Sequence, residues 1–287
     1  PVVSCGRTVL ATDRDGFLSG APDTGLIVHE TRLLSRCRFR IEGAPLFPVS
    51  LSNVSQRAWL GYYIAPAAPA GRKYAGPTTD ASIYTAAQEA IELKLLRVVG
   101  EGMHEDVDLI NFTQHPQRLR LVLDLESDFA DQNETHGKRR QSGRTTSEWI
   151  ERGEVSELRT IYEAAHRYEH SSETGKARIR RGLAVRFSNA QSAPERHGDA
   201  IKFDVELPPH GSWHCCIDYI PIIEEQELFP QYSCPFTPHA QGEHERKMQA
   251  FLDGAPTFSS RESASLAPVV IGALEQGKRD LASLRLY

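Results

Sequence analysis

Three carboxylates at Asp128, Asp131 and Glu134 lie within one short stretch of the chain. Hydrolysis of a glycosidic bond uses two carboxyl groups, one to protonate the leaving oxygen and one to activate water or attack the sugar. These groups must flank the bond, and acids from a single short loop are poorly placed to do so. The spacing therefore favours a loop tied down by hydrogen bonds between side chains and backbone over a catalytic acid pair.

Histidines and cysteines are the next candidates for chemistry. Two histidine pairs have a spacing of four residues, which aligns metal ligands only on a helix, yet both lie in predicted strand or turn sequence: His166 with His170, and His210 with His214. The five cysteines are odd in number and show no metal-ligand spacing: Cys5, Cys37, Cys215, Cys216 and Cys234. We expect no metal, no cofactor and reduced thiols in a cytoplasmic protein.

Other catalytic signatures are missing from the sequence. There is no phosphate-binding glycine loop, dinucleotide fingerprint or serine-hydrolase elbow. Aromatic residues such as Trp59, Tyr62, Tyr63 and Tyr74 could stack on sugar rings, but packing in the core is the more frequent role of such residues. The residues alone therefore assign no catalytic group.

The element that must position the three acids is the stretch Leu119–Gly137. Its leucines recur at every second position from Leu119 to Leu125, and Arg120 and Asp124 fall on the opposite face. That period of two predicts a half-buried strand, because successive side chains in a strand point to opposite faces. The strand runs into an acidic turn around Phe129.

Similar strand-like segments, separated by polar or Gly/Pro turns, continue along the chain. They predict an all-β protein, a large antiparallel sandwich. Further strands are expected at Val2–Leu10, Gly25–Arg40, two positions within Pro45–Tyr63, Glu89–Val99, Val107–Phe112, Trp149–Ile150, Glu157–Glu163, Ala177–Phe187, Ile201–Leu207 and Ser212–Ile220. Thr12–Gly20 is expected to be a turn and Ala65–Pro77 a loop. Two helices are expected near the C-terminus, one ending at Gly254 and one over Pro268–Tyr287.

Composition narrows the class of protein. The 287 residues are 40% hydrophobic and 25% charged, which is typical of a globular protein rather than a disordered or fibrous one. The net charge of -5 gives no general attraction to nucleic acid or to an anionic membrane. No segment reaches the roughly 20 apolar residues that span a bilayer. We expect neither nucleic acid nor membrane as a partner.

Three segments, in order, resemble a known family. They are DRDG at Asp13–Gly16, GLIVHETRLLSRCRFRIEG at Gly25–Gly43 and DFADQNETHG at Asp128–Gly137. Together they are similar to the N-terminal domain of bacterial glycogen-debranching, amylo-α-1,6-glucosidase-like proteins. The chain departs from the family's usual pattern at Glu30, where an Asp is usual, and in QNETHG.

The resemblance implies a β-supersandwich over residues 1–225 and a helical linker over residues 226–287. The linker would lead to an (α/α) toroid in the same polypeptide that carries the general acid and base. The sandwich would then be non-catalytic, walling the toroid's sugar pocket. Candidate interdomain or substrate-wall residues are Asp13, Arg14, Thr31, Arg32, Asp128, Phe129 and Asp131.

Two expectations complete this interpretation. The DFAD loop should approach the GLIVHETR segment, with Arg32 or Arg14 paired to Asp128 or Asp131, since a partly buried carboxylate needs a partner. The expected function is support of an α-1,6-glucosidase acting on an α-glucan such as glycogen. The alternatives are a free-standing carbohydrate-binding module and an aldose-epimerase-like sandwich enzyme.

Overall fold

The computed structural model describes residues 1–67, 90–137, 143–170, 173–234, 237–238, 243–259 and 266–283. Within strands and helices, some side chains lie outside this set: those of His166, Tyr168, His170, Ser233, Thr237, Pro238, Glu243, His244, Glu245 and Ser283. Most of the expected loop at Ala65–Pro77 is likewise outside the described residues.

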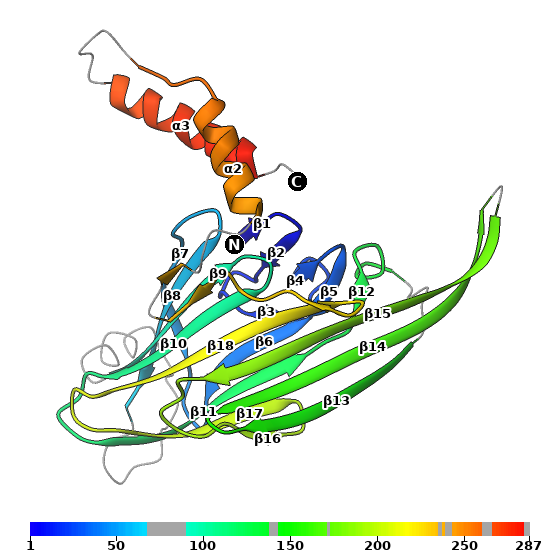
Figure 1. Ribbon diagram of the computed structural model, residues 1–287. Coiled ribbons are helices and arrows are strands. Elements are labelled where there is room, and N and C mark those ends of the chain that lie inside the picture. The colour runs from blue at the N-terminus through cyan, green and yellow to red at the C-terminus, as the bar shows by residue number, and fades with distance from the viewer. Residues whose placement is uncertain are drawn as a thin grey trace.

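The largest sheet has nine antiparallel strands and forms one layer of a sandwich (Figure 1). Its order is β13 (Gly143–Arg152), β14 (Val155–His170), β15 (Glu173–Ser188), β18 (Ser212–Ile223), β10 (Met103–Asn111), β9 (Ala90–Val99), β8 (Ala58–Pro66) and β7 (Phe47–Asn53), with β19 (Gln226–Glu227) paired to β18.

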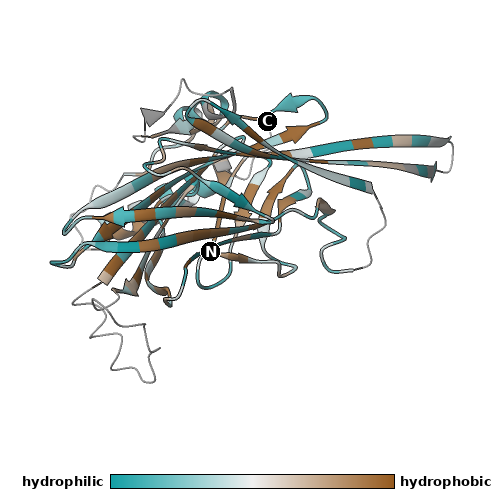
Figure 2. Ribbon diagram, turned by 90° about the horizontal axis from the view of Figure 1, so that it is seen from below, coloured by the Kyte–Doolittle hydropathy of each residue, from teal (hydrophilic) through white to brown (hydrophobic). Residues whose placement is uncertain are grey.

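A five-stranded antiparallel sheet forms the opposite layer. Its order is β16 (Glu195–His197), β17 (Ala200–Leu207), β11 (Gln117–Glu126), β6 (Arg36–Ile41) and β3 (Leu18–Ser19). The buried face of the predicted central strand β11 packs in the same core as strands of the large sheet, and Phe203 on β17 meets Trp213 on β18 with ring centroids 5.2 Å apart. Alternating hydrophilic and hydrophobic residues along the strands are visible in Figure 2.

A second five-stranded sheet lies along one edge of the sandwich (Figure 1). Its order is β1 (Val2–Cys5), β2 (Thr8–Ala11), β4 (Gly25–Val28), β5 (Thr31–Leu34) and β12 (Ala130–Asp131). Its apolar side chains belong to the main core, so the three sheets share one interior. The expected all-β antiparallel sandwich is confirmed.

Several strands differ from their predicted lengths. The predicted strand Val2–Leu10 is the hairpin β1–β2, which turns at Gly6 with a φ of 58°. The predicted strand Gly25–Arg40 is three strands, β4, β5 and β6. Strands β14 and β15 run to 16 residues each, and their far ends project beyond the other strands as a two-stranded hairpin (Figure 1).

The chain leaves the large sheet through β19, β20 (Tyr232–Ser233) and β21 (Thr237–Pro238) before two helices. Helix α2 (Glu243–Gly254) ends at the predicted Gly254, and α3 (Ala267–Ser283) covers most of the second expected helix. The two helices pack on each other and project from the sandwich (Figure 1). None of the described helices has the length and apolar character needed to cross a bilayer. A division into domains at residue 225 stays a prediction.

Candidate functional site

The DFAD loop and the GLIVHETR segment lie side by side. Strand β12 pairs with β5, so that Ala130 lies opposite Arg32 and Asp131 opposite Thr31. The Arg32 side chain is 6% exposed, and its Nε donates to both carboxylate oxygens of Asp128 at 3.1–3.2 Å. The expected approach of the two segments, with Arg32 paired to Asp128, is confirmed.

Arg32 also fixes the loop that precedes its own hairpin. Its Nη1 donates to the carbonyl oxygens of Ala21 at 2.9 Å and of Thr24 at 3.2 Å. The guanidinium therefore joins three segments, and its planar fork suits this role because several donors point in fixed directions. Gly25, with a φ of 151°, leaves the space in which the stem of Arg32 lies.

The remaining acids of the DFAD loop are engaged in local structure. An Asp131 carboxylate oxygen accepts from the backbone N–H of Asn133 at 2.7 Å, and a Glu134 oxygen accepts from the N–H of Asp131 at 3.1 Å. Asp128 accepts from the N–H of Ala130 at 3.3 Å as well as from Arg32. These contacts fit the tied-down loop that the spacing favoured over a catalytic pair.

Phe129 is the apolar anchor of this loop. It is buried, and its ring stacks on Tyr162 of β14 with centroids 5.5 Å apart and planes within 6°. Its φ of 51° is uncommon for a residue other than glycine. The stack therefore holds the loop against the large sheet.

The DRDG turn is anchored to the large sheet by a buried network. Arg97 of β9 donates from Nη1 to the carbonyl oxygen of Gly16 at 2.6 Å and from Nε to Glu105 at 2.6 Å, and both side chains are at most 1% exposed. Gly16 has a φ of 83°, and a Cβ there would meet the Trp59 and Tyr63 rings at 2.4 Å. The glycine of this motif is therefore required by close packing.

The other two candidates in this turn behave differently from Arg32. Arg14 is exposed and, among the described residues, pairs with neither Asp128 nor Asp131. Asp13 has one buried carboxylate oxygen, Oδ2, without a hydrogen-bond partner in the described structure. The assignment of Asp13 and Arg14 as interdomain or substrate-wall residues stays a prediction.

A cavity of about 370 Å³ opens beside Asp128, between the end of β11 and strands β13–β15. Polar side chains line it together with leucines and a valine: Ser35, Glu126, Ser127, Asp128, Thr145, Ser147, Thr160, Arg196 and Asp199. Such groups can bind hydroxyls, but no aromatic ring is among the described lining residues. The part of the cavity wall that the structure describes therefore offers no platform on which a sugar ring could stack.

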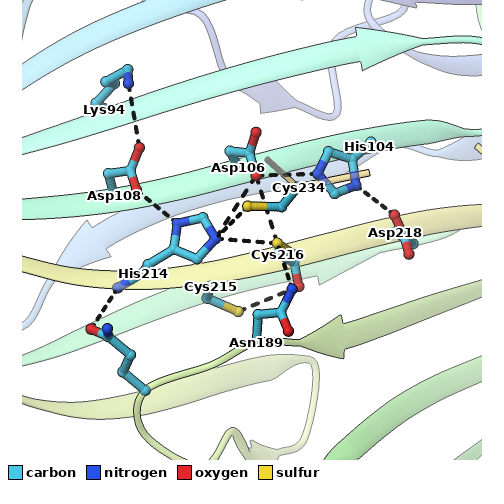
Figure 3. A network of polar contacts seen from close by, with 11 residues as sticks. Lys94, His104, Asp106, Asp108, Asn189, His214, Cys215, Cys216, Asp218 and Cys234 are labelled. Atoms are coloured by element: carbon cyan, nitrogen blue, oxygen red, sulfur yellow. Dashed lines mark hydrogen bonds and ion pairs between the residues drawn. The ribbon is translucent and has the colours of Figure 1, made fainter. Parts of the chain in front are cut away.

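A second polar cluster lies on strands β10 and β18, and the sequence patterns missed it (Figure 3). It brings together Asp106, His214, Cys216 and Cys234, whose donor atoms all lie within 4.8 Å of one another. The expected absence of a metal-ligand arrangement rested on helical spacing and on local cysteine motifs. Here His214 and Cys216 share one face of a strand at a spacing of two, which is the signal that could have found them.

The pKa values in this cluster are strongly shifted. Hydrogen bonding to Asp108 raises the pKa of His214 to about 10. Burial raises the pKa of Cys216, but hydrogen bonds with His104 and His214 outweigh burial and lower it to about 7. His210, four residues before His214, is exposed in a turn with a φ of 57° and takes no part. The side chains of His166 and His170 lie outside the described residues.

Of three comparisons with known proteins, the one with family models assigns this chain to a family. A comparison with curated proteins finds no match. Among solved structures, the chain is similar to one described as "Putative kojibiose phosphorylase from human microbiome", with 8% identity and a TM-score of 0.37. That similarity covers 98% of this chain and 30% of that one, so the chain spans under a third of that protein's length. Residues 3–218 match the family described as the N-terminal domain of some glycogen debranching enzymes, and the chain belongs to that family.

Proposed function

We propose that this chain is the non-catalytic β-sandwich domain of an amylo-α-1,6-glucosidase type enzyme of α-glucan metabolism. In this proposal it supports an (α/α) toroid of the same polypeptide and walls the entry to the toroid's substrate site. Membership of the debranching-enzyme family supports the assignment to this class of enzyme. The acids of the DFAD loop are held by Arg32 and by backbone N–H groups, which supports a structural role for them.

One observation carries the proposal of a second domain. Helix α3 presents large apolar side chains to solvent: Val269, Val270, Leu274 and Leu281 are 44–68% exposed, and Leu266, directly before the helix, is 70% exposed. Contiguous apolar surface of this kind is typical of an interaction site rather than of a free surface. A helical toroid suits this face, because helices pack by interlocking their apolar ridges and grooves.

Sugar titration and a hydrolysis assay test the non-catalytic part of the proposal. We expect no release of glucose from isomaltose-type or maltose-type linkages by the 287-residue chain, and no measurable heat in calorimetric titrations with maltooligosaccharides. In this chain by itself, where the described residues around the cavity include no stacking ring, a sugar would be buried on one side only. Glucose release that Asp131→Asn abolishes and Glu206→Gln leaves intact would overturn the proposal. Low-micromolar binding would instead favour the carbohydrate-binding module.

A further inference from the structure

The cluster on strands β10 and β18 has the dimensions of a metal site. His214 Nε2 lies 3.2 Å from Cys216 Sγ, 3.3 Å from Cys234 Sγ and 3.9 Å from Asp106 Oδ1. Cys216 Sγ lies 3.6 Å from Asp106 Oδ1. Zn²⁺ binds sulfur at about 2.3 Å and nitrogen or oxygen at about 2.0–2.2 Å, so tetrahedral donors stand roughly 3.3–3.8 Å apart. The distances from Cys234 to His214 and from Cys216 to Asp106 fall within that range, and the other two lie just outside it.

Backbone geometry explains why the donors converge. Asp106 and Cys216 are opposite each other in the β10–β18 ladder, and Asp108 is opposite His214. All four side chains point away from the core, because the alternate residues Val107 and Cys215 are buried in it. Cys234, which follows β20, supplies a donor from a separate segment (Figure 3).

A surrounding shell of hydrogen bonds orients the donors. His214 Nδ1 contacts Asp108 at 2.7 Å, so that Nε2 faces the cluster, and Lys94 lies 3.5 Å from the same carboxylate. His104 contacts Asp106 from Nε2 at 3.2 Å and Asp218 from Nδ1 at 2.7 Å. Histidine ligands of zinc commonly have a carboxylate on the second ring nitrogen.

Thiol catalysis is the competing interpretation of these residues. Cys216, His214 and Asp108 form a chain of contacts like that of a nucleophile, base and orienting acid. However, Cys216 is only 1% exposed, and a nucleophile must meet its substrate. The carboxylate of Asp106 and a second thiol, Cys234, crowd the same sulfur, an arrangement that nucleophilic attack does not need and that metal binding does.

We propose that Asp106, His214, Cys216 and Cys234 bind a structural Zn²⁺ ion. Two sulfurs, one imidazole and one carboxylate are donors that zinc accepts in tetrahedral sites, and thiolates select it over magnesium or calcium. The ion fastens the segment around Cys234 to the outer face of the nine-stranded sheet. That segment follows β19 and precedes α2, so the site fixes where the helical arm leaves the sandwich.

Metal content and thiol protection test this proposal on the whole 287-residue chain. We expect the chelator-treated protein to take up one zinc per chain. Bound zinc should protect the partly exposed Cys234 from alkylation, read by mass spectrometry. Cobalt should give the intense visible bands of a tetrahedral site with thiolate-to-metal charge transfer. Alkylation of Cys234 at the same rate with and without zinc, or a cobalt spectrum without charge transfer, would overturn the proposal.

Variants separate this site from adventitious binding. Cys234→Ser, at a partly exposed position, should lower zinc affinity about tenfold or more. His210→Gln, at an exposed histidine four residues before His214 in the sequence, should leave affinity unchanged. Cys215→Ala serves as the control for loss of a neighbouring thiol that faces the core. Equal zinc affinity in Cys234→Ser and His210→Gln would contradict the proposal. Circular dichroism shows that both variants are folded before their zinc affinities are compared.

In native protein, removing zinc should raise amide hydrogen exchange around residues 229–234 and leave the central strand β11 unchanged. The proposed ion joins the first segment to the sheet, whereas β11 is held by its own ladder with β6 and β17. Identical exchange in both segments with and without zinc would show that no ion fastens this segment.

Discussion

At the scale of single residues, the Arg32–Asp128 pair joins two of the family motifs directly. Removing a charge from water is costly, so a nearly buried guanidinium must be paired and fully hydrogen-bonded. Arg32 meets this condition with one carboxylate and two carbonyl oxygens. The pair therefore stabilises one specific arrangement of the DFAD loop against the β4–β5 hairpin.

Arg32→Lys should lower the free energy of unfolding by about 1.5–3 kcal/mol, the range measured for hydrogen bonds to charged groups. Lysine keeps the charge but cannot donate to Asp128 and to both carbonyls with a rigid fork. The control is Arg36→Lys, because Arg36 and Glu126 form an ion pair that is 44% and 48% exposed. That change should cost less than about 0.5 kcal/mol. Equal losses in urea denaturation would contradict the assigned role of Arg32.

The residue types predicted part of this site. Two aspartates around an apolar ring at the end of a strand indicated a need for an arginine, and Arg32 provides it. The carbonyl partners of Arg32 could not be predicted, because they depend on where the backbone of residues 21–24 folds. The cluster of Asp106, His214, Cys216 and Cys234 was missed for a related reason: Asp106 and Cys216 are 110 residues apart, and only strand register brings them together.

At the scale of elements, the β4–β5 hairpin carries backbone strain. His29 and Glu30 connect the two strands with φ values of 47° and 65°. Two-residue hairpin turns with both φ values positive favour asparagine and glycine, and other residues are disfavoured there. Backbone strain of this kind is often retained where a residue has a function. The turn residues His29 and Glu30 of the family segment carry such strain.

Glu30→Asn should therefore stabilise the chain by about 0.5–1 kcal/mol, since the left-handed conformation costs most residues about 1–2 kcal/mol and asparagine less. The backbone hydrogen bond from Gln132 to the carbonyl of Glu30, at 3.0 Å, is unaffected by the change. Glu154→Asn is the matched control, because Glu154 is an exposed turn residue outside the positive-φ set. A thermal melt in which Glu30→Asn stabilises no more than the control would show that the turn is not strained.

Alternation of apolar residues predicted most strands but not all of their ends. It succeeded for β11, where one face lies in the core and the other does not. It failed at the far ends of β14 and β15, where the described side chains of β15 are largely exposed and leave no apolar pattern to detect. It also joined β4, β5 and β6 into one strand, because a turn made of His29 and Glu30 carries no glycine or proline signal.

At the scale of the whole molecule, the sandwich is a platform from which a helical arm projects. Helix α3 contacts the sandwich through a hydrogen bond between Asp280 and Gln56, while Ala282 is fully buried. The proposed zinc ion lies upstream of that arm and limits its freedom. The wide apolar face of α3 is left to solvent, and a second domain fixed on it would be held at a defined angle to the motif-bearing edge.

The double change Val270→Gln with Leu274→Gln tests that arrangement. In the 287-residue chain both side chains are half exposed, so the free energy of unfolding should change by less than about 0.5 kcal/mol. In a protein that also contains the proposed toroid, the same change should lower the stability of the domain contact by about 3 kcal/mol, because each side chain would lose its burial. Differential scanning calorimetry of both proteins measures the two effects.

Arg279→Gln is the control, because Arg279 is exposed and lies on the side of the helix opposite to Val270. It should be neutral in both proteins. If the double variant is as stable as Arg279→Gln in the longer protein, α3 does not carry the domain contact. If it destabilises the 287-residue chain to the same extent as the longer protein, the apolar face packs within this chain and needs no second domain. Only a loss confined to the longer protein fits a sandwich that holds a toroid through α3.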